Sequence, residues 1–180
     1  VAPMIPLPPD PTAAALQALT CGETPELRAA APMLLHKALA RWPAHPELID
    51  ALVTLCEELP ETALLEARAL VPLLDAQAKR VDDRGADLSA AAARLLGFTD
   101  AAEAFNKLIV ALGIDPRHAA ARRQLSALLS DPSIALEDGM ETLAFGAFRG
   151  EIDAQAVIAV FDLCQGRSPL SRQRSLLARI

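Results

Sequence analysis

The chain has 180 residues and a formal net charge of −6, and apolar residues make up 52% of it. A protein that neutralises phosphates needs a basic surface, so this charge argues against nucleic acid as a partner. No uncharged apolar run reaches the roughly 18 residues of a membrane span. Ala and Leu dominate, aromatic residues reach only 3% and Tyr is absent. This composition favours helices over strands and predicts an all-α fold.

Residues 1–11 read VAPMIPLPPDP and contain five prolines. Such a composition is typical of an extended, polyproline-like segment. We therefore predict an extended lead-in over residues 1–11, acting as a linker. In the alternative, Met4, Ile5 and Leu7 lie across a groove between neighbouring helices.

Proline and glycine mark the expected helix boundaries after the lead-in. A capping residue followed by proline favours a helix start, because proline has a helical φ and no amide hydrogen to leave unpaired. The chain contains six such pairs: Asp10-Pro11, Thr24-Pro25, His45-Pro46, Asp115-Pro116, Asp131-Pro132 and Ser168-Pro169. Glycines after apolar runs are expected to end helices, namely Gly22, Gly97, Gly113 and Gly166. The predicted helices cover 12–21, 25–42, 46–59, 62–80, 87–96, 100–112, 116–130, 132–148 (broken near Gly139), 153–165 and 169–179. Pro32 and Pro72 should kink or split the helices that contain them.

Two segments of the chain share one pattern. Residues 38–59 read ALARWPAHPELIDALVTLCEEL, and residues 111–129 read ALGIDPRHAAARRQLSALL. In each segment an Ala-Leu pair ends an apolar helical stretch, a proline follows five residues after the Ala, and a second amphipathic stretch begins three residues later. Internal similarity of this kind is typical of stacked helix–turn–helix units.

The best-formed unit covers residues 85–118. Its first helix offers Leu88, Ala91, Ala92 and Leu95, and its second offers Ala104, Leu108, Ala111 and Leu112, with Pro116 closing the unit. Small residues let crossing helices approach closely, while leucines fill the flanks. This placement and the length of 34 residues resemble the tetratricopeptide (TPR) repeat family.

The resemblance extends to residues 12–45, where Ala31, Leu35, Ala38 and Pro43 take the matching positions, and to Ile49 and Leu52 in the next helix. The register is lost after Leu59, and residues 131–167 show no repeat pattern. The resemblance implies antiparallel helix hairpins stacked as a short TPR-like α-solenoid, and the alternative is a non-repeat helical bundle. The expected organisation is the lead-in at 1–11, a TPR-like domain at 12–167, and a C-terminal capping or docking helix at 168–180 that could mediate self-association.

An acidic stripe is the one surface feature that suggests a partner. Between Arg41 and Arg68 every charged residue is acidic, and four residues at steps of three and four share one helical face: Glu47, Asp50, Thr54 and Glu57. In TPR-like stacks the first helix of each unit lines a concave groove that binds peptides. The resemblance thus implies that the stripe faces the groove and prefers a basic segment. The corresponding groove positions of 119–130 include Arg123, with Arg122 alongside, so the groove is expected to change sign along its length. The alternative is an ordinary solvated helix face.

Residues that could carry catalysis are sparse. Cys21, Cys56 and Cys164 are far apart and form no CxxC, which is typical of buried cysteines in a reducing compartment and favours a cytoplasmic protein. His36, His45 and His118 lack the spacing of a zinc-binding helix, and the last two occupy equivalent places near helix starts, where a capping role is expected. No catalytic residue, metal site or cofactor is assigned.

These observations predict a non-catalytic scaffold that binds a protein or peptide, with neither nucleic acid nor a membrane as partner. Two alternatives remain. TPR-like regions precede catalytic domains in many bacterial proteins, so the resemblance also implies a helical N-terminal or accessory domain of a larger bacterial enzyme of glycosyltransferase, sulfotransferase or methyltransferase type. The other alternative is a helical bundle that senses a small molecule held between its helices.

Overall fold

The computed structural model describes residues 5–21 and 25–130. All described elements are α-helices or short 3-10 helices, and neighbouring helices pack antiparallel, so the predicted all-α class is confirmed. The predictions that fall outside the described residues are the helices 132–148, 153–165 and 169–179, the C-terminal helix at 168–180, the caps at Thr24, Asp131 and Ser168, the glycines at 22 and 166, and Cys164.

The chain divides into two compact units, Val1–Leu95 and Leu96–Ile180. This boundary falls inside residues 85–118, so the packing of that repeat as a whole stays a prediction. In the described residues the first unit holds α1 (Pro11–Thr20), α2 (Pro25–Arg41), α3 (Pro46–Glu58), η2 (Glu61–Ala63), α4 (Leu64–Ala67), η3 (Arg68–Leu70), α5 (Val71–Ala78) and nearly all of α6 (Gly85–Leu96). The second unit holds η4 (Gly97–Asp100), α7 (Ala101–Ile114) and α8 (Ala119–Ser130).

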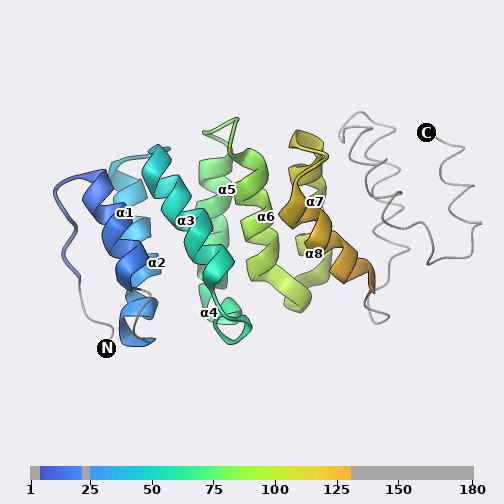
Figure 1. The fold of residues 1–180 in the computed structure, drawn as a ribbon, viewed down its shortest axis with the longest axis horizontal. Helices are drawn as coiled ribbons and strands as arrows, with labels where there is room; N and C mark the ends of the chain where they lie inside the picture. The colour runs from blue at the N-terminus through green and yellow to red at the C-terminus, as the bar shows by residue number, and fades with distance from the viewer. Residues whose placement is uncertain (1–4, 22–24, 131–180) are drawn as a thin grey trace, which may run out of the picture. The chain divides into compact units, whose positions relative to one another are not determined.

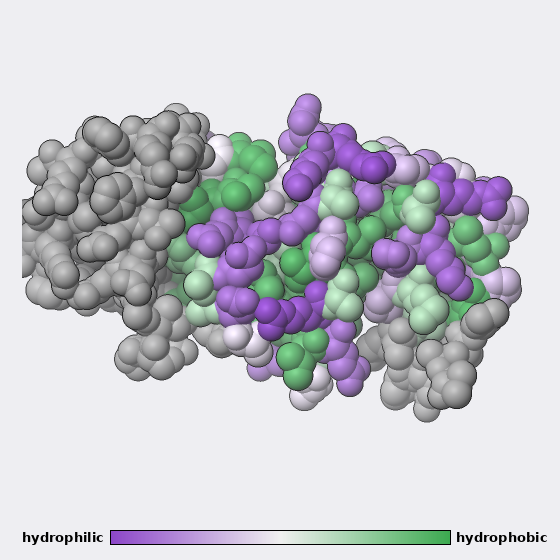
Figure 2. Space-filling view, turned by 180° about the vertical axis from the view of Figure 1, so that it is seen from behind, coloured by the Kyte–Doolittle hydropathy of each residue, from purple (hydrophilic) through white to green (hydrophobic). Residues whose placement is uncertain are grey.

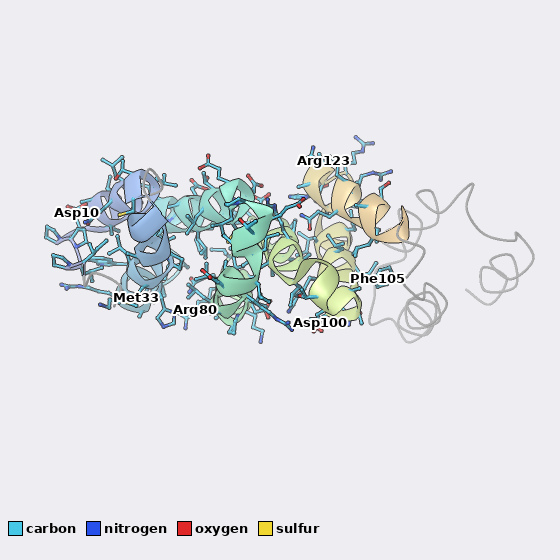
Figure 3. All side chains as sticks on the ribbon, turned by 90° about the horizontal axis from the view of Figure 1, so that it is seen from below. Asp10, Met33, Arg80, Asp100, Phe105 and Arg123 are labelled. Atoms are coloured by element: carbon cyan, nitrogen blue, oxygen red, sulfur yellow. The ribbon has the colours of Figure 1, made fainter. Side chains whose placement is uncertain are left out.

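The helices of the first unit form two layers. α1 packs against both α2 and α3, and α2 packs against α3. Figure 1 shows α1, α3 and α6 side by side in front, running in the same direction, with α2 and α5 behind them. The labelled residues of Figure 3 agree, because Met33 of α2 and Arg80, which follows α5, lie along the same edge of the unit.

The core of the first unit is built from aliphatic side chains and alanines. The residues expected at the repeat positions are buried, including Ala31, Leu35, Ala38, Ile49, Leu52, Leu88, Ala91, Ala92 and Leu95. Leu74 of α5 joins the same cluster. The alanines bring helix axes close together, and the leucines fill the space at their sides.

The two prolines expected to disturb helices behave differently. α2 continues without a break through Pro32. The helix predicted over 62–80 is instead divided into η2, α4, η3 and α5, and Pro72 is the second residue of α5. At that position proline has no amide hydrogen to leave unpaired, which explains why the main helical body begins there.

The second unit corrects two predicted boundaries. α7 packs against α8 and η4, and its buried face includes Ala104, Leu108, Ala111 and Leu112, as predicted. Gly97 has a φ of +50°, as expected for a residue that ends a helix. Gly113, however, lies within α7, which ends one residue later because Asp115 adopts an extended conformation.

The start of α8 is the other correction. Asp115-Pro116 was predicted to begin a helix over 116–130, but α8 begins at Ala119. The Asp115 side chain accepts a hydrogen bond from the Arg117 amide at 3.0 Å, which closes a turn before the helix. The prediction was wrong because an Asx turn and a helix cap use the same residue types.

The lead-in lies against the first unit. Ile5 and Leu7 are half-buried and pack against its core cluster. Asp10 then begins α1 as predicted, since its carboxylate accepts from the Ala13 amide at 2.8 Å. The structure therefore matches the alternative in which Ile5 and Leu7 lie across helices, whereas Met4 falls outside the described residues.

Candidate functional site

The acidic stripe occupies the exposed face of α3. Glu47, Asp50 and Glu57 are exposed and Thr54 is half-buried, while the other face of the helix is buried against the core. Glu58 is exposed beside Glu57. The periodicity of the sequence thus placed the four residues on one face of α3. On the far side of the molecule, Figure 2 shows hydrophilic and hydrophobic side chains interspersed over the first unit.

Arg84 forms an ion pair with Asp50 in the middle of the stripe. Its Nη1 donates to Asp50 Oδ1, and its Nε donates to Asp87 Oδ2 at 2.7 Å. Burial alone would lower the pKa of Arg84, but the hydrogen bonds and charges of Asp50 and Asp87 outweigh it and raise this pKa. The guanidinium therefore stays charged and ties α3 to the start of α6. Sequence reasoning missed this contact because Asp50 and Arg84 are 34 residues apart.

Arg94 holds the other end of α3. Its Nη1 and Nη2 donate to the carbonyl oxygens of Cys56 and Leu59, each at 2.8 Å. These carbonyls belong to the last turn of α3, where backbone acceptors lack partners within the helix. The start of α6 thus contacts the first half of α3, and the end of α6 contacts the end of α3. The two helices therefore run parallel.

The predicted basic residues lie in the second unit. Arg123 of α8 is exposed, and Figure 3 shows it on the outer side of that helix. Arg122 is half-buried, and its Nη1 donates to the Pro116 carbonyl at 3.1 Å. Glu47, Asp50, Thr54 and Glu57 belong to the first unit, so a groove that joins the two sets stays a prediction.

His45 and His118, which occupy equivalent places in the two similar segments, differ in their hydrogen bonds. His118 caps α8, because its Nδ1 accepts from the Ala121 amide at 3.1 Å. His45 is the N-cap of α3 but makes no capping hydrogen bond with its side chain, and among the described residues its Nδ1 has no partner. His36 is exposed on α2. The expected capping role is confirmed for His118 alone.

The turn before α3 depends on a distant side chain. Ala44 has a φ of 57°, the left-handed region in which a side chain is strained. Its amide donates to Oε1 of Gln77 at 2.9 Å, and Gln77 is only 4% exposed on α5. The buried side chain of Gln77 on α5 therefore holds the connection between α2 and α3 in place.

The described cysteines are structural. Cys21 and Cys56 are free thiols and both are buried. Burial raises the pKa of Cys56 from 9.0 to about 12, with a smaller opposing effect of Arg94 and a further increase from Glu57. A thiol with this pKa is protonated at neutral pH and is a poor nucleophile.

Metal-binding and membrane-spanning features are absent from residues 5–21 and 25–130. This part of the chain contains no group of three or more His, Cys, Asp or Glu side chains that could hold a metal ion. None of its helices is both long and apolar enough to cross a membrane.

Comparison with known proteins gives no match. No family model, no curated protein and no solved structure matches the chain. The resemblance to TPR repeats therefore rests on the residues alone.

Proposed function

We propose that the chain is a non-catalytic interaction module with a TPR-like stack of helices, and that the exposed face of α3 binds a basic segment of a protein partner. The observation that carries this proposal is the arrangement of α3. Three carboxylates on one face of this helix, Glu47, Asp50 and Glu57, reach solvent, while its opposite face is committed to the core.

The parallel alignment of successive helices supports the TPR-like stack. α1 and α3 run in the same direction with α2 antiparallel to both, and Arg84 and Arg94 hold α6 parallel to α3. In a stack of hairpins, the first helices of successive units lie side by side in this way. Their exposed faces then form one continuous surface.

Charge supports a basic partner over an acidic one. Glu47 and Glu57 lie at the two ends of the stripe, and Arg84 neutralises Asp50 between them. A partner with two cations about three helical turns apart would pair with both glutamates. The contact is solvent-exposed, so each pair contributes roughly 0.5–1 kcal/mol and falls off with salt.

The test is a titration with a basic peptide. Isothermal calorimetry would measure binding of a synthetic peptide with lysines at alternating positions to wild type and to the double variant Glu47→Lys/Glu57→Lys. We expect the variant to bind roughly 5- to 30-fold more weakly, which corresponds to two lost pairs. Asp50 is left unchanged, because its replacement would also release Arg84.

A matched control removes the effect of net charge. Glu61 and Glu66 are also exposed in the first unit but belong to η2 and α4, outside the stripe. Glu61→Lys/Glu66→Lys changes the net charge by the same amount and should bind the peptide as wild type does. Equal weakening in both double variants would mean that the peptide responds only to overall charge, and the α3 face would lose its assigned role.

A further inference from the structure

The lead-in is an extended segment that packs against the first unit. Residues 5–9 have no helical structure, and they approach the first unit through side chains. Figures 1 and 3 show this segment alongside α1 and α2, on the side of the hairpin away from α3. This surface is separate from the acidic stripe, so a ligand bound there is independent of the proposed function of α3.

The anchors of the lead-in alternate along the chain. Ile5 and Leu7 are half-buried against the core cluster, whereas Pro6 between them is exposed. Among the described residues, residues 5–9 make no hydrogen bond to α1 or α2. The segment is therefore held by apolar side chains and not by pairing of backbones.

The receiving surface suits such a segment. Ile5 and Leu7 pack against the core cluster to which the buried alanines of α1 belong, namely Ala14, Ala15 and Ala18. Prolines restrict the free segment to extended conformations, which lowers the entropy lost on docking.

We propose that this side of the α1–α2 hairpin is a binding site for extended proline-rich peptides of the form apolar-Pro-apolar-Pro-Pro, and that Ile5 and Leu7 of the lead-in occupy it in cis. A partner with the same chemistry binds when it displaces the lead-in. A tethered segment acts at an effective concentration on the order of 1 mM. A free peptide with a Kd of about 100 µM would therefore bind the wild type about tenfold more weakly than a chain whose own anchors are removed.

The experiment uses the full chain and a labelled peptide of residues 1–11. Fluorescence anisotropy would measure binding of this peptide to wild type, to Ile5→Asp/Leu7→Asp and to Leu65→Asp. Leu65 is 66% exposed on α4, so the last variant adds a charge without touching the lead-in anchors. We expect at least tenfold tighter binding to the double variant than to the other two proteins. The same peptide with Asp at both anchor positions should bind none of them.

Two binding outcomes would contradict the proposal. If the double variant keeps its helicity and does not bind the peptide, the lead-in is only a covering segment. Equal affinity for all three proteins would place the peptide elsewhere. If the aspartates unfold the first unit, Ile5→Ala/Leu7→Ala replaces them, and unfolding by this milder pair would also refute exchange, because a segment required for folding cannot leave its site.

Discussion

Replacement of Arg94 tests whether one side chain from α6 secures the end of α3. Arg94→Met keeps much of the side-chain volume and removes the two hydrogen bonds, each 2.8 Å long, to the carbonyls of Cys56 and Leu59. A hydrogen bond from a charged donor contributes roughly 1.5–3 kcal/mol. Arg94 is half-buried, and water can reach part of this helix end, so the sum is reduced to about 2–4 kcal/mol.

The assay follows the first unit alone. Trp42 is the only tryptophan of the chain, and it packs against the core cluster of this unit. Its fluorescence during urea unfolding therefore reports the loss of packing in the first unit. With a denaturant slope of about 1–2 kcal/mol per M, we expect the midpoint of Arg94→Met to fall by roughly 1–4 M.

Two companion variants distinguish the hydrogen bonds from the charge. Arg94→Lys keeps a cation near the negative end of α3 but has no planar fork, so its midpoint should lie between those of wild type and Arg94→Met. Arg80 is exposed, and Arg80→Met should change stability by less than about 0.5 kcal/mol. If Arg94→Met were as stable as Arg80→Met, the contacts with α3 would contribute nothing and the reasoning would fail.

Three further changes can be followed with the same assay. The pKa of Cys56 is about 12 in the folded state, against an ordinary 9.0, so the folded chain binds this proton more tightly than the unfolded chain does. The resulting stability is fully present below pH 9 and is lost as the pH rises toward 12. Urea midpoints measured across this pH range should therefore fall less steeply for Cys56→Ala than for the wild type. Ala44→Gly should stabilise the first unit by about 0.5–1 kcal/mol, because glycine adopts the positive φ of 57° without strain. Gln77→Leu should destabilise it by about 1–3 kcal/mol, since the Ala44 amide loses its acceptor. An unchanged midpoint for Gln77→Leu would show that water replaces this hydrogen bond.

Local patterns in the sequence were enough to predict most helices of the described region. Asp10 and Gly97 act where short-range chemistry requires a cap and a left-handed residue, and the buried alanines and leucines follow the helical period. Errors arose where two local solutions compete. Asp115 closes a turn instead of starting a helix. In the 62–80 segment Pro72 marks the start of α5, as predicted, but no residue marks the earlier divisions between η2, α4 and η3.

The contacts that position the acidic stripe could not be predicted from the sequence. The periodicity predicts that Glu47, Asp50 and Glu57 share a face, because that depends only on spacing within one helix. Arg84 and Arg94 reach α3 across 34 to 38 residues of chain, and the sequence carries no signal that selects these partners. Asp50 at the centre of the stripe is consequently engaged in an ion pair within the chain, which the sequence alone does not show.

The two similar segments, residues 38–59 and 111–129, show which features internal similarity predicts and which it does not. Both connections keep the same spacing, since α2 ends at Arg41 and α3 starts at Pro46, while α7 ends at Ile114 and α8 starts at Ala119. The stabilising contacts nevertheless differ. In the second copy the turn is held by its own residues, Asp115 and His118.

In the first copy a left-handed Ala44 is held by Gln77, which lies 33 residues away. The turn between α7 and α8 is therefore held by local contacts, whereas the α2–α3 connection also depends on a contact with α5. Because α3 carries the acidic stripe, the position of that surface depends on the packing of α5 as well as on α6. Substitutions at buried positions of α5 should thus alter binding at α3 without touching the stripe itself.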